Sequence, residues 1–122
     1  MELQRRLEGK VAIVTGGGQG IGKSEAHLLA ELGAAVVVND RGAGETGQRA
    51  ADRVVDEINA KGGRAVANYA DVSNWKEAEG LVHQAVDAFG TLDILVCNAG
   101  IVRDRMLFNM SEGEWDDVFA FT

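Results

Sequence analysis

The sequence predicts an α/β fold, in which a parallel sheet carries helices on both faces. The apolar run from Val11 to Val14 leads into a turn with five glycines in residues 16–22, and a helical pattern follows. A second apolar run, rich in β-branched residues, extends from Ala34 to Asn39. Strand, helix and strand within roughly 30 residues are typical of a right-handed βαβ unit with parallel strands.

Two further strands are predicted at residues 64–69 and 92–98, and each follows a helical pattern. We therefore expect a Rossmann-type sheet of four parallel strands in the order 3-2-1-4. After the fourth strand come a polar loop and the start of another helix at Trp115, with no stop signal before Thr122. We expect the fourth strand to be an unpaired edge, and residues 1–122 to form one incomplete domain.

Each predicted helix has an apolar face and a stop signal. The face of the first helix, which ends before Gly33, consists of Ile21, Leu28, Leu29 and Leu32. The second carries Ala50, Ala51, Val54, Val55 and Ile58. The third has Asn74 as its N-cap, Glu77 as the capping-box partner and Gly90 as its stop. We expect its apolar stripe, which includes Trp75, to pack in the core.

The glycine-rich turn is typical of a phosphate-binding site. The first N–H groups of a helix have no intrahelical partner and lie at its positive end, and glycine lets a pyrophosphate approach the backbone. Residues 17–24 match the P-loop pattern G-x-x-x-x-G-K-S, in which Lys23 would reach the outer phosphates and Ser24 would hold magnesium. Residues 15–22, T-G-x-x-x-G-x-G, have instead the glycine spacing of a dinucleotide-binding turn. These residues alone leave both interpretations open.

Asp40, at the end of the second strand, bears on this choice. It lies 18 positions after Gly22, close to the spacing of about 20 at which a Rossmann acid binds the adenosine ribose. A carboxylate there favours NAD, because it would repel the extra phosphate of NADP. The neighbouring Arg41 weakens that inference, since an arginine can pair with this phosphate. A strand-end turn residue and a Walker B aspartate are the alternative interpretations of Asp40.

The composition excludes several classes of protein. Nineteen acidic against 12 basic residues give a net charge of -7, which argues against a nucleic-acid partner. The single cysteine, Cys97, excludes an internal disulfide, and two scattered histidines leave no metal-ligand cluster. No segment approaches the roughly 20 apolar residues of a membrane span. We therefore expect a soluble, cytosolic protein without a metal site.

Four motifs in order resemble the N-terminal half of the short-chain dehydrogenase/reductase family. They are the T-G-x-x-x-G-I-G turn at residues 15–22, Asp40, the pair Asp71-Val72 and the segment Asn98-Ala99-Gly100. Their agreement over nearly the whole chain makes the P-loop match a coincidence. The resemblance is nearest to the dehydrogenase unit of multifunctional enzymes that act on (3R)-hydroxyacyl-CoA, because of the runs VVVNDRG and CNAGIVRDRML.

The resemblance implies a role for each matched residue. In the turn, Gly16 would allow the tight bend, Gly20 and Ile21 would approach the pyrophosphate, and Gly22 would let the helix pack on the sheet. Asp40 would bind the ribose hydroxyls, Asp71 the adenine amino group and Val72 a face of the adenine. The segment from Asn98 to Gly100 would lie beside the nicotinamide ribose, with Asn98 bracing the sheet. The remaining predicted cofactor residues are Gly18, Gln19, Arg41 and Ala99.

The resemblance also implies an NAD-dependent oxidoreductase that transfers hydride between a secondary alcohol and a ketone, with a 3-hydroxyacyl thioester as the substrate class. The family's catalytic tyrosine has a lysine four residues later, whereas Tyr69, the one tyrosine here, is followed by Ser73. We therefore assign no catalytic residue and expect the chain alone to be inactive. A dinucleotide-binding module completed by another polypeptide or by self-association is the first alternative, and a P-loop hydrolase the second.

Overall fold

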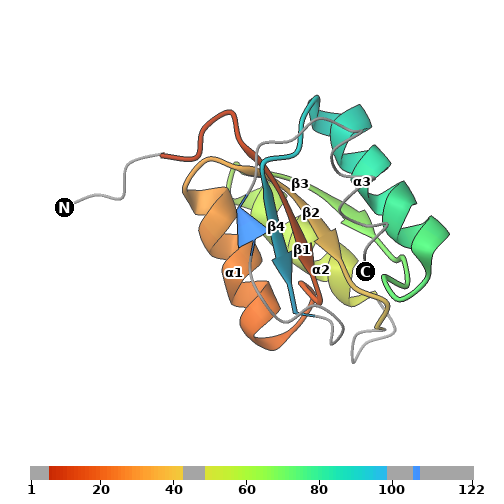
Figure 1. Cartoon of the computed structure of the whole chain (residues 1–122). Helices are drawn as coiled ribbons and strands as arrows, with labels where there is room; N and C mark the ends of the chain where they lie inside the picture. The colour runs from red at the N-terminus through yellow and green to blue at the C-terminus, as the bar shows by residue number, and fades with distance from the viewer. Residues whose placement is uncertain (1–5, 43–48, 99–105, 108–122) are drawn as a thin grey trace.

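The computed structural model describes residues 6–42, 49–98 and 106–107 (Figure 1). Its elements alternate between strand and helix as far as the fourth strand. In chain order they are β1 (Val11–Thr15), α1 (Gly20–Glu31), β2 (Ala35–Asn39), α2 (Ala50–Ala60), β3 (Arg64–Asn68), α3 (Trp75–Phe89), β4 (Ile94–Cys97) and β5 (Met106–Leu107).

The strands form one sheet in the order β3-β2-β1-β4-β5. Strands β1 to β4 are parallel, so the predicted fold class and the 3-2-1-4 order are confirmed. The expectation that β4 is an unpaired edge is wrong, because β5 pairs with it antiparallel, with Leu107 opposite Ile94. A strand of two residues is too short to produce a periodic pattern, so β5 could not be predicted from periodicity.

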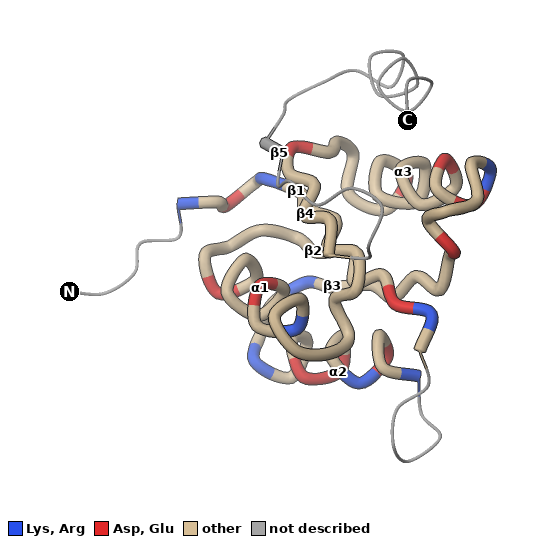
Figure 2. Tube along the Cα trace, turned by 60° about the horizontal axis from the view of Figure 1, so that its bottom comes forward, with Lys and Arg blue, Asp and Glu red and all other residues tan. Residues whose placement is uncertain are grey.

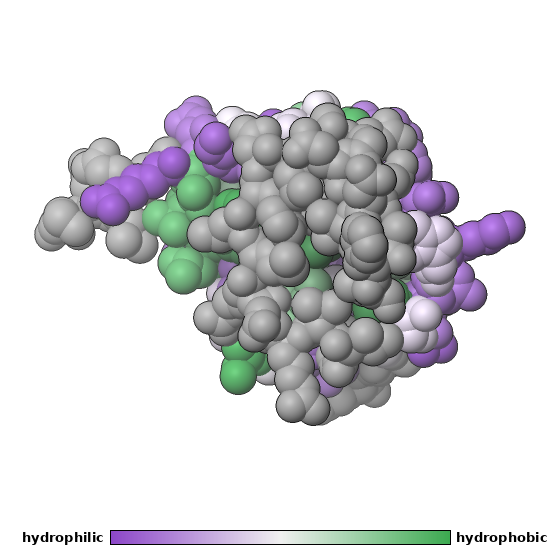
Figure 3. All heavy atoms as spheres, in the orientation of Figure 1, coloured by the Kyte–Doolittle hydropathy of each residue, from purple (hydrophilic) through white to green (hydrophobic). Residues whose placement is uncertain are grey.

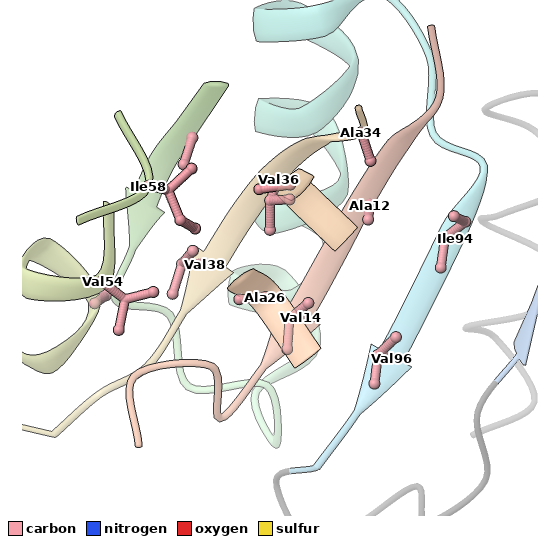
Figure 4. Packing of buried hydrophobic residues seen from close by; sticks show 13 residues of the cluster. Ala12, Val14, Ala26, Ala34, Val36, Val38, Val54, Ile58, Ile94 and Val96 are labelled. Atoms are coloured by element: carbon pink, nitrogen blue, oxygen red, sulfur yellow. The ribbon is translucent and has the colours of Figure 1, made fainter. Parts of the chain in front are cut away.

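The sheet lies between two helical layers, with α1 and α2 on one face and α3 on the other (Figure 2). Every residue of β1 and β2 is buried, as expected for parallel strands covered on both faces. Alternate residues point to opposite layers, so Ala12, Val14, Val36 and Val38 pack under α1 and α2 (Figure 4). Val11, Ile13 and Val37 pack instead with Leu81, Val82 and Ala85 of α3.

Helix α1 buries small residues, and the apolar face that the sequence predicts is only partly confirmed, because Leu29 packs half-buried against the core whereas Ile21 and Leu28 do not. Its buried residues are Gly22, Ala26 and Ala30, spaced at four, whereas Ile21 is 70% exposed and Leu28 48% exposed. Figure 3 shows apolar surface on the side of the molecule where α1 lies. Small side chains let the helix backbone lie close to the sheet, and Ile21 and Leu28 are turned outward. Trp75 is also 43% exposed, at the start of α3, and its predicted core position is wrong.

Gly22 marks the closest approach of α1 to the sheet. A Cβ atom at this position would lie 2.0 Å from the carbonyl oxygen of Gly16, in the turn after β1. Backbone atoms cannot give way at that distance as a flexible side chain could. The first turn of α1 therefore requires glycine at residue 22.

Helices α1 and α2 are joined by a charged cluster. The Nε2 atom of His27 lies 2.9 Å from Oε1 of Glu57, and Nζ of Lys23 lies 3.6 Å from the same oxygen. The hydrogen bond with His27 lowers the pKa of Glu57 below its ordinary value near 4.5, against a smaller opposing effect of desolvation. Glu57 is thus ionised in the folded protein over a wider pH range than in the unfolded chain.

Replacing Glu57 by glutamine should reduce stability at pH 7 but not in acid. The lowered pKa adds stability above the unfolded value near 4.5, and this contribution disappears as the pH falls through the folded value. Because the Glu57 side chain is 35% exposed, we expect less than about 1 kcal/mol in the free energy of unfolding. Urea denaturation at pH 7 and pH 3 measures this change in the free energy of unfolding. Glu79→Gln on α3 is the control, and a loss that is equal at both pH values would contradict the assignment.

Replacing Gly22 by alanine should destabilise the fold by more than about 2 kcal/mol, because the added methyl overlaps a backbone carbonyl. Gly80 offers a matched control within α3, since no described atom beyond its chain neighbours and the backbone of its own helix lies within 4 Å of a Cβ built there. Gly80→Ala should stabilise by about 0.5–1 kcal/mol through helix propensity. Urea denaturation measures the free energy of unfolding of both variants, and an equal change in the two would contradict the close packing at Gly22.

Candidate functional site

The carboxyl ends of the parallel strands meet at one edge of the sheet. Thr15 of β1 is in register with Asn39 of β2 and Cys97 of β4, and Asn39 is in register with Asn68 of β3. The loops that follow these strands carry the predicted site residues 16–22, Asp40, Arg41, Asp71, Val72 and Asn98. Ala99 and Gly100 lie outside the described residues. Connections run in opposite directions from β1 and β4, and ligands of open α/β sheets bind at such a switch point.

The turn from Gly16 to Gly20 leaves the start of α1 open. Gly16 and Gly20 have positive φ angles of 63° and 56°, which glycine adopts readily. Gln19 is the N-cap, and among the described residues its side chain makes no capping hydrogen bond and the first turn holds no acid. No described atom lies within 4 Å of a Cβ built on Gly20. The N–H groups at this positive helix end can therefore receive an anion.

Asp40 is fixed against this turn by both of its carboxylate oxygens. Oδ2 accepts a hydrogen bond from the backbone N–H of Gly18 at 3.0 Å, and Oδ1 accepts one from that of Gly42 at 2.8 Å. A Cβ on Gly18 would lie 2.6 Å from Cβ of Ala50, so glycine is required there as well. Each oxygen keeps a further lone pair, so the carboxylate can also accept hydrogen bonds from ligand hydroxyls. The spacing of Asp40 from Gly22 did not reveal the bond to Gly18.

Asp71 is held in the loop after β3. Its Oδ1 accepts hydrogen bonds from the hydroxyl and the backbone N–H of Ser73, and its Oδ2 lies 3.3 Å from Nη1 of Arg41. The pKa of Asp71 is lowered mainly by the hydrogen bond from the Ser73 hydroxyl and next by that from the Ser73 N–H, with a weaker effect of the Arg41 charge. Desolvation acts in the opposite direction and raises this pKa. Asn74 caps α3 as predicted, but the Glu77 carboxylate accepts from the N–H of Asp71 rather than from that of Asn74.

Val72 and Cys97 border the site from the α3 side. Val72 is half-buried and packs against the core under α3, which leaves part of its side chain exposed at the loop. Cys97 is half-buried against the same core, and burial raises the pKa of its thiol. Cys97 thus packs against the core as a residue of the strand, and a thiol with a raised pKa is a poor nucleophile.

Asn98 joins the ends of β1 and β4. Its backbone N–H donates to Oγ1 of Thr15 at 3.0 Å, and its Nδ2 donates to the Thr15 carbonyl oxygen at 3.2 Å. The Thr15 hydroxyl donates in turn to the carbonyl oxygen of Val96. Asn98 thus holds the two central strands together beside the switch point, in the position from which the resemblance expects it to brace the sheet.

Sequence reasoning missed a buried amide network under the loops after β2 and β3. Asn39, only 2% exposed, donates from Nδ2 to Oδ1 of Asn68 at 2.8 Å and to the Ala70 carbonyl oxygen at 3.1 Å. Nδ2 of Asn68 donates to Oε1 of Gln84 on α3. The signal available in the sequence was an asparagine at the end of each of two apolar runs, residues 39 and 68.

Lys23 does not lie over the glycine turn as a P-loop lysine would. Its Nζ is directed to Glu57 on α2, 3.6 Å away. Within residues 6–42 and 49–98, no three His, Cys, Asp or Glu side chains gather where they could hold a metal ion. Among the described helices, none combines the length and the apolar character needed to cross a membrane.

Tyr69 directly follows β3, and its side chain contacts residues at the start of α2. Its hydroxyl donates to Oδ1 of Asp52, and the guanidinium of Arg49 lies 4.3 Å from the centre of its ring. The bond to Asp52 raises the pKa of Tyr69, which is the opposite of what a general base needs.

These features fit a dinucleotide better than a nucleoside triphosphate. The open start of α1 suits a pyrophosphate, and the fixed carboxylate of Asp40 at the end of the adjacent strand suits ribose hydroxyls. A triphosphate held by a P-loop needs its lysine over the phosphates, and Lys23 is bound elsewhere.

Comparison with known proteins agrees with this geometry. The family model described as short chain dehydrogenase matches residues 10–122. The chain is 53% identical to the peroxisomal multifunctional enzyme A of Dictyostelium discoideum, and the match covers 90% of this chain and 25% of that protein. It is 52% identical to the hydroxyacyl-CoA dehydrogenase ChsB1 of Mycobacterium tuberculosis, over 93% of this chain and 36% of that protein.

A solved structure has the same fold. The 7α-hydroxysteroid dehydrogenase described as complexed with NADH and 7-oxo glycochenodeoxycholic acid superposes with a TM-score of 0.68 at 44% identity, over 75% of this chain and 34% of that one. This chain therefore spans between a quarter and about a third of the length of these three proteins. The motifs, the sheet order and these matches agree, and the chain belongs to the short-chain dehydrogenase family.

Proposed function

We propose that this chain is the NAD-binding half of a dehydrogenase that transfers hydride between a secondary alcohol and a ketone. The observation that carries the proposal is Asp40, whose carboxylate is fixed beside the glycine turn by the N–H groups of Gly18 and Gly42. In this position it would accept the ribose hydroxyls of NAD while the start of α1 receives the pyrophosphate. Asp71, Val72 and the segment from Asn98 to Gly100 complete the proposed site.

The nicotinamide would supply the redox chemistry, and this chain would bind and orient it. We propose residues 1–122 as one incomplete domain. A hydroxyacyl-CoA dehydrogenase and a multifunctional enzyme among the relatives support a 3-hydroxyacyl thioester as the substrate class. Tyr69 is followed by Ser73 four residues later and has a raised pKa, so we expect the purified chain to show no ketone reduction.

A binding module without catalysis is the second candidate, completed by another polypeptide or by a second copy. The exposure of Ile21 and Leu28 on α1 favours it, because an apolar helix face gains stability when covered. Sedimentation equilibrium tests completion by a second copy, since a folded monomer in dilute solution would contradict self-association. The cytosolic location stays a prediction; four relatives carry names that place them in peroxisomes.

Titration calorimetry of the purified chain with NAD, NADP and magnesium ATP tests the cofactor assignment. We expect the isolated chain to bind NAD weakly but selectively, and Asp40→Asn to weaken this binding by about a further tenfold because a charged acceptor of ribose hydrogen bonds is lost. Asp87→Asn, an exposed carboxylate on α3, is the matched control and should change nothing. Tighter binding of NADP than of NAD would contradict the role of Asp40.

Lys23→Ala separates the dinucleotide site from a P-loop. Because Lys23 pairs with Glu57 on α2, its removal should change the NAD dissociation constant less than about twofold. Calorimetry measures the dissociation constants of NAD and of magnesium ATP for the parent chain and for Lys23→Ala. Magnesium ATP binding that disappears in Lys23→Ala would support a nucleotide hydrolase instead.

A further inference from the structure

Two consecutive residues at the end of β2 are directed toward different neighbouring strands. The carboxylate of Asp40 reaches toward β1, where Gly18 donates to its Oδ2 at 3.0 Å. The guanidinium of Arg41 reaches toward the loop after β3, where its Nη1 lies 3.3 Å from Oδ2 of Asp71. Since β2 lies between β1 and β3 in the sheet, the negative group faces the glycine turn and the positive group is held away from it.

The carboxylate that holds Arg41 is itself fixed. Ser73 donates to Oδ1 of Asp71 from its backbone N–H at 3.0 Å and from its hydroxyl, which leaves Oδ2 for the guanidinium. The N–H of Asp71 is bound to Oε1 of Glu77 at 3.0 Å, so the loop backbone is also anchored to α3. These bonds favour the ionised carboxylate, which therefore carries its charge at neutral pH.

Resting on the proposed function, we propose that Asp71 sets cofactor specificity by holding Arg41 away from the position of a 2′-phosphate. A free arginine beside the ribose would form charge-assisted hydrogen bonds with the phosphate of NADP and offset its repulsion by Asp40. With Arg41 bound to Asp71, the ribose meets the carboxylate of Asp40 without a competing cation. Asp71 acts here as a positioning residue, in addition to any contact with adenine.

The test is a double-mutant cycle of Asp71→Asn and Arg41→Gln, read by calorimetry with NAD and NADP on the 122-residue chain at low ionic strength. The readout is the ratio of the dissociation constants for NAD and NADP. Because both dinucleotides contain the same adenine, a contact of residue 71 with adenine changes both constants equally and leaves their ratio unaltered. Asp71→Asn should shift this ratio toward NADP by about two- to fivefold, the range of an exposed ion pair. The same change in the Arg41→Gln background should leave the ratio unaltered, as should the control Asp87→Asn.

Two results would overturn the inference while leaving the proposed function intact. If Asp71→Asn shifts the ratio equally with and without Arg41, Asp71 acts by direct repulsion of the phosphate. If Arg41→Gln alone weakens NADP binding tenfold or more, Arg41 already reaches the phosphate in the parent chain. This result can be obtained even if the Asp71→Asn variant does not fold. Failure of the parent chain to bind either dinucleotide would contradict the proposed function and this inference together.

Discussion

The contact between the first turn of α1 and the turn after β1 is the constraint on which the site depends. Only glycine at residue 22 allows it, because a Cβ there would overlap the Gly16 carbonyl oxygen at 2.0 Å. This approach presents the first N–H groups of α1 at the carboxyl edge of the sheet, where β1 is in register with the ends of β2 and β4. It also places Gly18 where its N–H reaches Asp40 at 3.0 Å. The helix start and the acid therefore form one rigid unit.

Polar residues at the strand ends hold this unit in register. The amide of Asn98 clamps Thr15 at the ends of β4 and β1, while Asn39 and Asn68 join the ends of β2 and β3 to Gln84 on α3. At the opposite edge, the buried Asp93 accepts from the N–H of Val11 at 3.0 Å. Buried polar groups are costly unless they are paired, so these bonds favour one alignment of the strands over others.

The electrostatics of the site follow from the sheet order. Because β2 has β1 on one side and β3 on the other, adjacent residues at its end contact different loops, Asp40 the glycine turn and Arg41 the loop of Asp71. The resulting arrangement places an anion beside the glycine turn and pairs the adjacent cation, Arg41, with a second anion. A protein of net charge -7 can still bind a pyrophosphate in this way, because backbone N–H groups of a helix supply the positive potential.

The sequence by itself determined the strand order, the glycine turn and the positions of Asp40, Asp71 and Asn98, because apolar runs, glycine spacing and strand-end polar residues are local patterns. It did not determine which face of α1 is buried. Helical periodicity favoured Ile21 and the leucines, whereas the fully buried residues are Gly22, Ala26 and Ala30, and of the predicted face Leu29 packs half-buried against the core. The partners of Lys23, Arg41 and Asn39 were likewise decided by the tertiary structure, since each partner lies at least 29 residues away in sequence and the distance between them is set by the packing of the elements.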